Sequence, residues 1–211
     1  MAVAVPVPGE IVLAIDDYSS RMPHGISDDD HVLRLALDAR GHSVRPTVWG
    51  GDVEPGTTVL IRSTWDYVDH LDRFRAWLER LDEQGVVVHN PTSTIRGNLH
   101  KRYLTDLAAR GVRVVPTRLL AQGSPVTLDG VATATGWDDV VVKPAIGSTA
   151  RLTVHQSREG RGATATHLAN LLELIEPNLF LDLAPDSAEF LADALVALLT
   201  GQASAAPRPG D

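Results

Sequence analysis

The feature that most constrains the fold is an alternation of short apolar segments with amphipathic segments over the first 90 residues. Residues 11–15 (IVLAI) and 58–61 (TVLI) are apolar runs typical of strands that are buried on both faces of a parallel sheet. Residues 27–41 and 70–83 instead place apolar side chains at helical spacing. This alternation predicts an α/β fold, with a doubly wound parallel sheet and helices on both of its faces.

The pattern changes at Asn90-Pro91, so the chain is predicted to form two lobes. We place the parallel-sheet domain in residues 1–90, a smaller α+β lobe in residues 91–200 and a flexible tail in residues 201–211. Four further segments are assigned from local patterns: a helix over 98–110, a hairpin over 123–130, a loop over 151–166 and a helix over 187–199.

Composition excludes several classes of function. A net charge of -8 argues against a protein that binds nucleic-acid phosphates. The chain has no cysteine, which excludes thiolate metal sites and cysteine nucleophiles. The first ten residues lack the basic residues of a signal peptide, and no apolar run is long enough to span a membrane. A cytoplasmic protein without membrane or nucleic-acid partners is therefore expected.

One polar cluster directly follows the predicted strand at residues 58–61, where α/β proteins bind ligands. Arg62 opens the sequence RSTWDY and is able to bind a substrate carboxylate through two parallel hydrogen bonds. In the alternative interpretation, Arg62 pairs with Asp66 and the neighbouring aromatic residues cover the core.

Two lysines are the other candidates for ligand binding. Lys101 lies near the start of a predicted helix, where a cation is unfavourable unless an anion is bound, and this favours a phosphate. Lys143 ends a strand of valines and precedes a loop of small residues that can fold its N–H groups over phosphates, namely Gly147, Ser148 and Thr149. The alternatives are a solvated helix face for Lys101 and a Lys143 side chain that extends into water.

Two related folds fit the spacing poorly. Asp16 and Asp17 after the first strand, with a later Lys-Pro pair, also occur in phosphoacceptor receiver domains of signalling proteins. Such a domain needs an aspartate at the end of its third strand, where this chain has Arg62. Lys143 also lies 77 residues after Asp66, which exceeds two βα units of common length. A dinucleotide-binding fold would need G-x-G-x-x-G after the first strand, and the sequence lacks it there.

An ordered series of short motifs carries a family resemblance. The motifs are IRSTWDY at 61–67, NP at 90–91, NLHKRYL at 98–104, VVPT at 114–117 and VVKP at 141–144. The series resembles the ATP-grasp proteins related to glutathione synthetase and to the ligase of the D-cycloserine pathway. Near the end of the chain, LELIEPNLF at 172–180 resembles the strand that carries magnesium ligands in such enzymes. The resemblance covers about residues 10–150 and 171–199.

The resemblance implies a pre-ATP-grasp-like domain followed by an ATP-grasp-like lobe, which uses ATP to activate a carboxylate as an acyl phosphate before an amine attacks it. It implies that Lys101 and Lys143 bind the phosphates and that residues 147–149 close over them. Lys143 and Arg62 are the implied catalytic residues, with Arg62 on the substrate side.

The second lobe departs from the family pattern. Glu173 falls at one implied magnesium position with Glu176 beside it, but Leu171 stands where the family has another carboxylate. The family also has several strands and a helix where residues 151–171 form a short polar segment here. One carboxylate is a poor magnesium site, so the lobe is predicted to be truncated and its cofactors, ATP and Mg²⁺, to be bound weakly.

These observations lead to three functional hypotheses. The first is an ATP-grasp-like carboxylate–amine ligase, active or chemically impaired, with a small-molecule carboxylate and an amine as substrates. The second is a non-catalytic remnant of an ATP-grasp protein that binds a nucleotide or a partner protein. The third and least favoured is a receiver-type signalling module. A homodimer in which a second subunit completes the site is an open alternative to a monomer.

Overall fold

The computed structural model describes residues 10–148, 150–157 and 185–200. These residues form two compact units. The first unit contains the described residues up to Thr92 together with residues 185–200, and the second contains the described residues from Ser93 to 157. Each unit is described by itself below.

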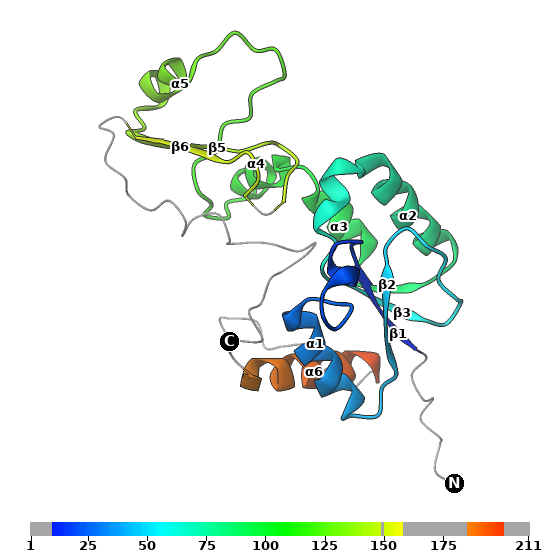
Figure 1. The fold of residues 1–211 in the computed structure, drawn as a ribbon. Helices are drawn as coiled ribbons and strands as arrows, with labels where there is room; N and C mark the ends of the chain where they lie inside the picture. The colour runs from blue at the N-terminus through cyan, green and yellow to red at the C-terminus, as the bar shows by residue number, and fades with distance from the viewer. Residues whose placement is uncertain (1–9, 149, 158–184, 201–211) are drawn as a thin grey trace. The chain divides into compact units, whose positions relative to one another are not determined.

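The first unit is built on a sheet of four parallel strands, β2-β1-β3-β4 (Figure 1). The strands are β1 (Ile11–Ile15), β2 (Val44–Val48), β3 (Thr58–Ile61) and β4 (Val87–His89). All residues of β1 and β3 are buried, as expected for central strands covered on both faces. The parallel sheet predicted from the apolar runs is confirmed.

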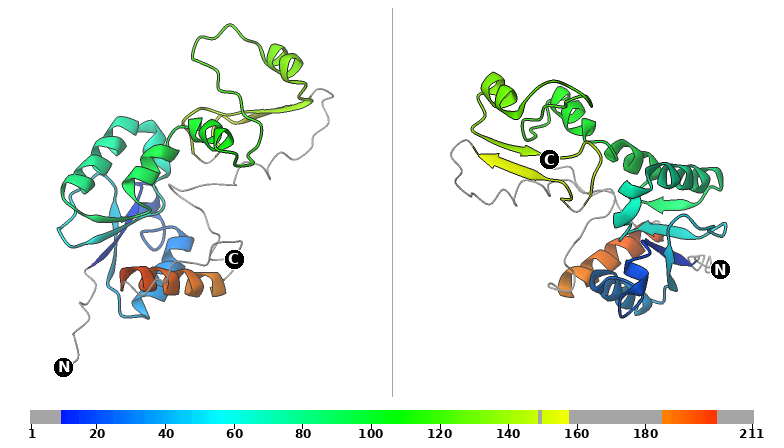
Figure 2. Two further views of the ribbon diagram at one scale, coloured as in Figure 1. Left: turned by 180° about the vertical axis from the view of Figure 1, so that it is seen from behind. Right: turned by 45° about the horizontal axis from the view of Figure 1, so that its top comes forward.

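Two helices connect the strands on opposite faces of this sheet (Figures 1 and 2). Helix α1 (Asp28–Asp38) lies between β1 and β2, and α2 (Leu71–Glu83) lies between β3 and β4. Short 3-10 helices, Ser19–Arg21 and Trp65–Asp69, follow β1 and β3. Ser27 caps α1 as its sequence predicts, because its hydroxyl accepts a hydrogen bond from the Asp30 amide at 3.2 Å.

Helix α6 (Pro185–Leu199) packs against α1 in the first unit. Ala188 and Ala192 of α6 are buried in the same apolar cluster as Leu33 and Leu37 of α1 and Leu13 of β1. The sequence predicted this helix, but we had assigned residues 91–200 to the second lobe. The structure instead joins α6 to the first unit, because its buried alanines share one apolar cluster with α1, β1 and Leu60 of β3.

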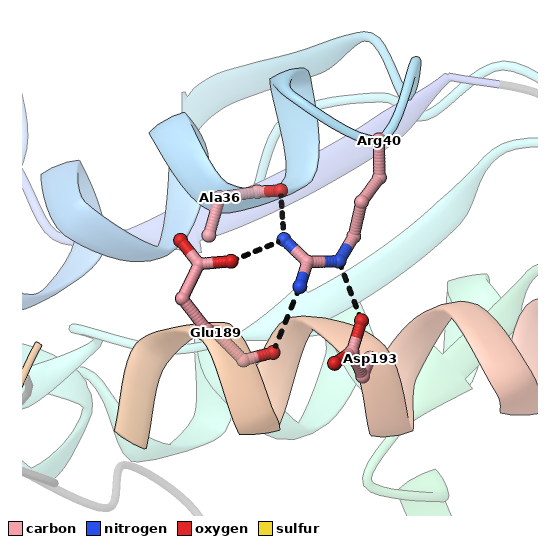
Figure 3. Close-up of polar contacts among 4 residues, drawn as sticks. All are labelled: Ala36, Arg40, Glu189 and Asp193. Atoms are coloured by element: carbon pink, nitrogen blue, oxygen red, sulfur yellow. Dashed lines mark hydrogen bonds and ion pairs between the residues drawn. The ribbon is translucent and has the colours of Figure 1, made fainter. Parts of the chain in front are cut away.

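Arg40, just beyond the end of α1, fixes α6 through several polar contacts (Figure 3). Its Nε donates to Asp193 Oδ1 at 2.7 Å, and its Nη1 donates to Glu189 Oε2 at 2.7 Å. Nη1 also donates to the Ala36 carbonyl at 2.8 Å, and Nη2 donates to the Glu189 carbonyl at 3.2 Å. Hydrogen bonds to Asp193 and Glu189 raise the pKa of the Arg40 guanidinium. The same side chain thus links the end of α1 to two successive turns of α6.

The second unit contains a two-stranded antiparallel sheet and short helices. The strands are β5 (Asp139–Val142) and β6 (Val154–Ser157), which pair from Asp139 opposite Ser157 to Val142 opposite Val154. The helices are α4 (Arg102–Ala109) and α5 (Leu128–Thr135), with α3 (Thr92–Asn98) at the junction with the first unit.

Several local predictions for this unit are wrong. The hairpin predicted over 123–130 is replaced by α5, because the Thr127 hydroxyl accepts from the Gly130 amide at 3.1 Å and caps a helix. The helix predicted over 98–110 is present as α4, but it begins later, at Arg102, and Asn98 is instead the last residue of α3. The loop predicted over 151–166 contains β6, and its residues from 158 onward lie outside the described part.

The contact between α6 and α1 generates a stability prediction. Ala192→Asp would place a carboxylate in a fully buried apolar site, so we expect it to reduce the free energy of unfolding by ~2–4 kcal/mol. The matched control is Ala194→Asp, at an exposed position of the same helix, with an expected loss below ~1 kcal/mol. Urea unfolding followed by circular dichroism measures both, and equal losses would show that α6 does not pack on α1 in solution.

Candidate functional site

The carboxyl edge of the parallel sheet contains the first group of candidate residues. The chain runs from β1 through α1 to β2 on one side and then crosses to β3 on the other side of β1. In open α/β sheets, ligands bind where the strand order reverses in this way, outside the carboxyl ends of the two central strands. Asp16 directly follows β1, and Arg62 directly follows β3, so both residues lie at this point.

Arg62 is buried and ion-paired with the start of α1. Its Nε donates to Asp30 Oδ1 at 2.7 Å, and its Nη2 lies 3.7 Å from Asp29 Oδ2. Ser63 Oγ donates to the other oxygen of Asp30 at 2.5 Å. The sequence analysis considered a pair with Asp66, but Asp66 instead accepts a hydrogen bond from Trp49 Nε1 at 2.5 Å. Arg62 as a residue on the substrate side therefore stays a prediction, and its guanidinium already contacts two carboxylates.

The two aspartates were not recognised as site residues from the sequence. Asp29 and Asp30 lie in the run of three acids after Ser27, which was interpreted only as the first turn of a helix. That interpretation is correct but incomplete. The amino end of α1 also lies at the carboxyl edge of β1, next to β3, so its acids reach Arg62. The run of acids in the connection after β1 was the sequence feature that could have indicated this contact.

Asp16 joins the segments after β1 and β3. It is only 2% exposed, and its Oδ1 accepts a hydrogen bond from the Ser19 amide at 2.7 Å. Its own amide donates to Ser63 O at 2.6 Å. Asp17, by contrast, is exposed and ion-paired with Arg21.

The second unit brings together the predicted phosphate-binding segments. Lys101 immediately precedes α4, and its amide donates to Ala145 O at 2.7 Å. Its Nζ donates to Gly147 O at 3.3 Å, so both its backbone and its side chain contact the loop after β5. A Cβ added at Gly147 would lie 3.7 Å from Lys101 Nζ, which shows how closely the loop approaches the ammonium group.

The other members of the predicted phosphate site lie in or near the same loop. Lys143 directly follows β5 and is half-buried, and Ser148 is buried. Thr149 lies outside the described residues. Lys101 and Lys143 are moreover the only two lysines among the 211 residues, although the chain has 19 basic residues in all. The use of arginine at all other basic Lys/Arg positions was visible in the sequence. It supports a specific role for these two lysines.

The predicted metal ligands, Glu173 and Glu176, lie outside the described residues. Among the residues that the structure does describe, no three His, Asp or Glu side chains form a group that could hold a metal ion. The magnesium site therefore stays a prediction that rests on the resemblance. Likewise, no helix within the described ranges is long and apolar enough to cross a lipid bilayer.

A shallow apolar groove of about 310 Å³ lies elsewhere in the second unit, between α4 and residues 112–117. Leu104 and Ala108 of α4 line one side, and Val112 and Pro116 line the other. None of the predicted site residues lines this groove, although Val114, Pro116 and Thr117 of the VVPT motif do.

Comparison with known proteins identifies relatives of the chain. Residues 11–90 match the family described as D-cycloserine synthetase DcsG, N-terminal domain. The cycloserine biosynthesis protein DcsG of Streptomyces lavendulae is 33% identical over 117 residues, which are 54% of this chain and 39% of that protein. The resemblance to the ligase of the D-cycloserine pathway, predicted from the ordered motifs, is therefore confirmed.

A solved structure of a relative shows a related fold. The crystal structure of D-cycloserine synthetase DcsG superposes with a TM-score of 0.59 and 25% identity over 92% of this chain and 56% of that one. An ATP-grasp RimK domain protein from Sphaerobacter thermophilus has a TM-score of 0.46 and 16% identity, over 90% of this chain and 59% of that one. The chain thus spans between 39% and 59% of the length of these relatives.

The buried ion pair of Arg62 generates a second stability prediction. Arg62→Met would leave Asp30 and Asp29 buried without their cation, so we expect a loss of about 3–5 kcal/mol in the free energy of unfolding. Arg45→Met is the control, because the Arg45–Glu10 pair is largely exposed and should contribute no more than about 1 kcal/mol. Denaturant titration measures both, and a small loss for Arg62→Met would show that this pair does not form.

His89, at the end of β4, generates a prediction of pH dependence. Burial lowers the pKa of His89 below its ordinary value of 6.5, so the unfolded chain binds a proton at a higher pH than the folded protein does. The stability contributed by neutral His89 is therefore lost as the pH falls below 6.5 towards the folded-state pKa. Melting temperatures measured across this range should depend less on pH in His89→Gln, and an unchanged dependence would contradict the assignment.

Proposed function

We propose that the chain binds the phosphates of ATP through the second unit and acts as an ATP-grasp-like carboxylate–amine ligase. The observation that carries the proposal is the contact of Lys101 with the loop after β5, through its amide to Ala145 O and through its Nζ to Gly147 O. Two segments 46 positions apart are thereby joined where the sequence predicted a shared phosphate site.

The chemistry of these residues suits a phosphate chain. Lys101 precedes the first turn of α4, so its ammonium group lies at the positive end of the helix dipole. Lys143 adds a second cation at the end of β5, and the loop after it contains the small residues Gly147 and Ser148, of a kind that can fold around phosphates. In a chain with a net charge of -8, such a local cationic site is needed to attract an anionic nucleotide.

The remaining roles follow from the resemblance. ATP, when bound, supplies the phosphoryl group that activates the carboxylate as an acyl phosphate. Lys101, Lys143 and residues 147–149 would bind its phosphates, with Lys143 also stabilising the charge that develops during transfer. Glu173 and Glu176 would hold Mg²⁺, and Arg62 would act on the substrate side. We propose the cytoplasm as the location because it supplies ATP.

A non-catalytic role in nucleotide binding is the second candidate. The chain covers 39% of the length of DcsG, and the described part of the second unit has a sheet of only two strands. ATP that is bound against a single sheet remains in contact with water. Each lysine–phosphate contact then contributes only about 1 kcal/mol to the binding free energy. Weak binding with slow or undetectable turnover is the expected behaviour of an isolated monomer.

Calorimetric titration of the full chain with ATP, with and without Mg²⁺, tests the nucleotide site. We expect a dissociation constant in the millimolar to high-micromolar range (roughly −4 to −6 kcal/mol), and Lys143→Ala should abolish the binding. Arg113→Ala, which removes an exposed cation of the same unit, should bind ATP as the unmodified chain does. ATP should also protect Lys101 and Lys143 from acetylation by a soluble reagent, which mass spectrometry can follow because the chain has no other lysine.

The outcomes separate the candidates. Binding with release of ADP that depends on a carboxylate, trapped with hydroxylamine as a hydroxamate, supports the ligase. Binding without turnover supports the non-catalytic role, and the absence of both binding and protection would refute a nucleotide site. Repeating the titration over a range of protein concentrations shows whether a homodimer forms the competent state, because affinity would then rise with concentration.

A further inference from the structure

A buried polar cluster at the carboxyl edge of the sheet has unsatisfied hydrogen-bonding groups. Ser19 and Thr64 are both fully buried, at 0% exposure. Their hydroxyl oxygens, Ser19 Oγ and Thr64 Oγ1, have no hydrogen-bond partner within the part of the chain that the structure describes. A buried hydroxyl without a partner destabilises a folded protein, so such groups are uncommon unless a ligand or a water completes them.

Both hydroxyls belong to segments that Asp16 joins. Ser19 is the residue whose amide donates to Asp16 Oδ1 at 2.7 Å, and Thr64 follows Ser63, whose carbonyl accepts the Asp16 amide at 2.6 Å. The other carboxylate oxygen, Asp16 Oδ2, accepts no hydrogen bond from the described residues. Asp16 Oδ2, Ser19 Oγ and Thr64 Oγ1 are therefore three oxygen acceptors to which no described residue donates a hydrogen bond, in the two segments that follow β1 and β3.

The charge of the cluster defines the ligand that it fits. Asp16, Asp29 and Asp30 carry three formal negative charges, and Arg62 carries one positive charge, which leaves an excess of two negative charges among buried side chains. The guanidinium of Arg62 already contacts Asp30 and Asp29. An anionic substrate group would add to the negative excess, whereas a protonated amine would neutralise part of it.

We propose that Asp16, Ser19 and Thr64 bind the protonated amino group of the amine substrate. An ammonium group has three N–H donors, which match the one carboxylate oxygen and two hydroxyl oxygens available here. This inference rests on the proposed ligase function and assigns the amine, not the carboxylate, to the carboxyl edge of β1 and β3. It differs from the expectation drawn from the sequence, in which Arg62 would bind a substrate carboxylate at this edge.

Nuclear magnetic resonance of the full chain, without nucleotide, tests the site. The probes are alaninamide, which has a protonated amine and no carboxylate, and N-acetylalanine, which has a carboxylate and no charged amine. We expect alaninamide to shift the backbone amide signals of Asp16, Ser19 and Thr64 in a saturable manner, and N-acetylalanine to leave them unchanged. No response to alaninamide would mean that an ordered water alone completes the hydroxyls, and an equal response to both probes would also overturn the proposal.

Two variants identify the residues that bind the amine. Asp16→Asn should weaken binding of alaninamide by about tenfold or more, because a charge-assisted hydrogen bond becomes a neutral one. Asp17→Asn, at the exposed neighbouring residue, should bind it as the unmodified chain does. The dispersion of the amide signals shows whether each variant is folded.

Ser19→Ala separates binding from structure. Because it removes a buried hydroxyl that has no partner, it should leave the melting temperature of the free protein unchanged or raise it, while it weakens alaninamide binding several-fold. A fall in melting temperature without a change in affinity would show a purely structural hydroxyl and overturn the assignment. Failure of this site leaves the ATP titration unaffected, because that titration depends on Lys101 and Lys143 in the other unit.

Discussion

The position of β1 between two parallel neighbours is the constraint on which the first unit depends. Its backbone is hydrogen-bonded to β2 on one side and to β3 on the other, and all five of its residues are buried. The chain passes from β1 to β2 on one side and then crosses to β3 and β4 on the other side. Because both connections are right-handed, α1 and α2 cover opposite faces of the sheet, and the loops after β1 and β3 meet at one edge. Asp16, Arg62 and the amino end of α1 come together for this reason.

Local patterns were sufficient to predict most of the first unit. The apolar runs at β1 and β3 and the apolar stripe of α2, with Phe74, Trp77 and Leu78 buried, required no knowledge of distant contacts. The hairpin predicted at 123–130 was wrong because Thr and Gly are common both in turns and at helix caps. Only the Thr127–Gly130 hydrogen bond shows that a helix begins here. The candidate lysines were also selected from local motifs, and their role in phosphate binding stays a prediction.

The partners of the site residues could not be predicted, because they depend on distant segments. Arg62 was compared with Asp66, four positions away, but its nearest carboxylate is Asp30, which is 32 positions away and is brought close by the parallel pairing of β1 with β3. Lys101 similarly contacts Gly147 over a separation of 46 residues. The motifs indicated the candidate residues, and the fold determined which of them meet.

The contact between Arg40 and Asp193 has a consequence for the order of folding. These residues are 153 positions apart, and the whole second unit lies between the two segments of the first. During synthesis, the sheet and α1 emerge from the ribosome well before α6, so the part of their apolar cluster that α6 covers stays open until translation has passed residue 199. The closure of so long a loop slows folding far more than it reduces stability. The nascent chain therefore carries an incompletely covered apolar cluster, which favours aggregation, until α6 has been synthesised.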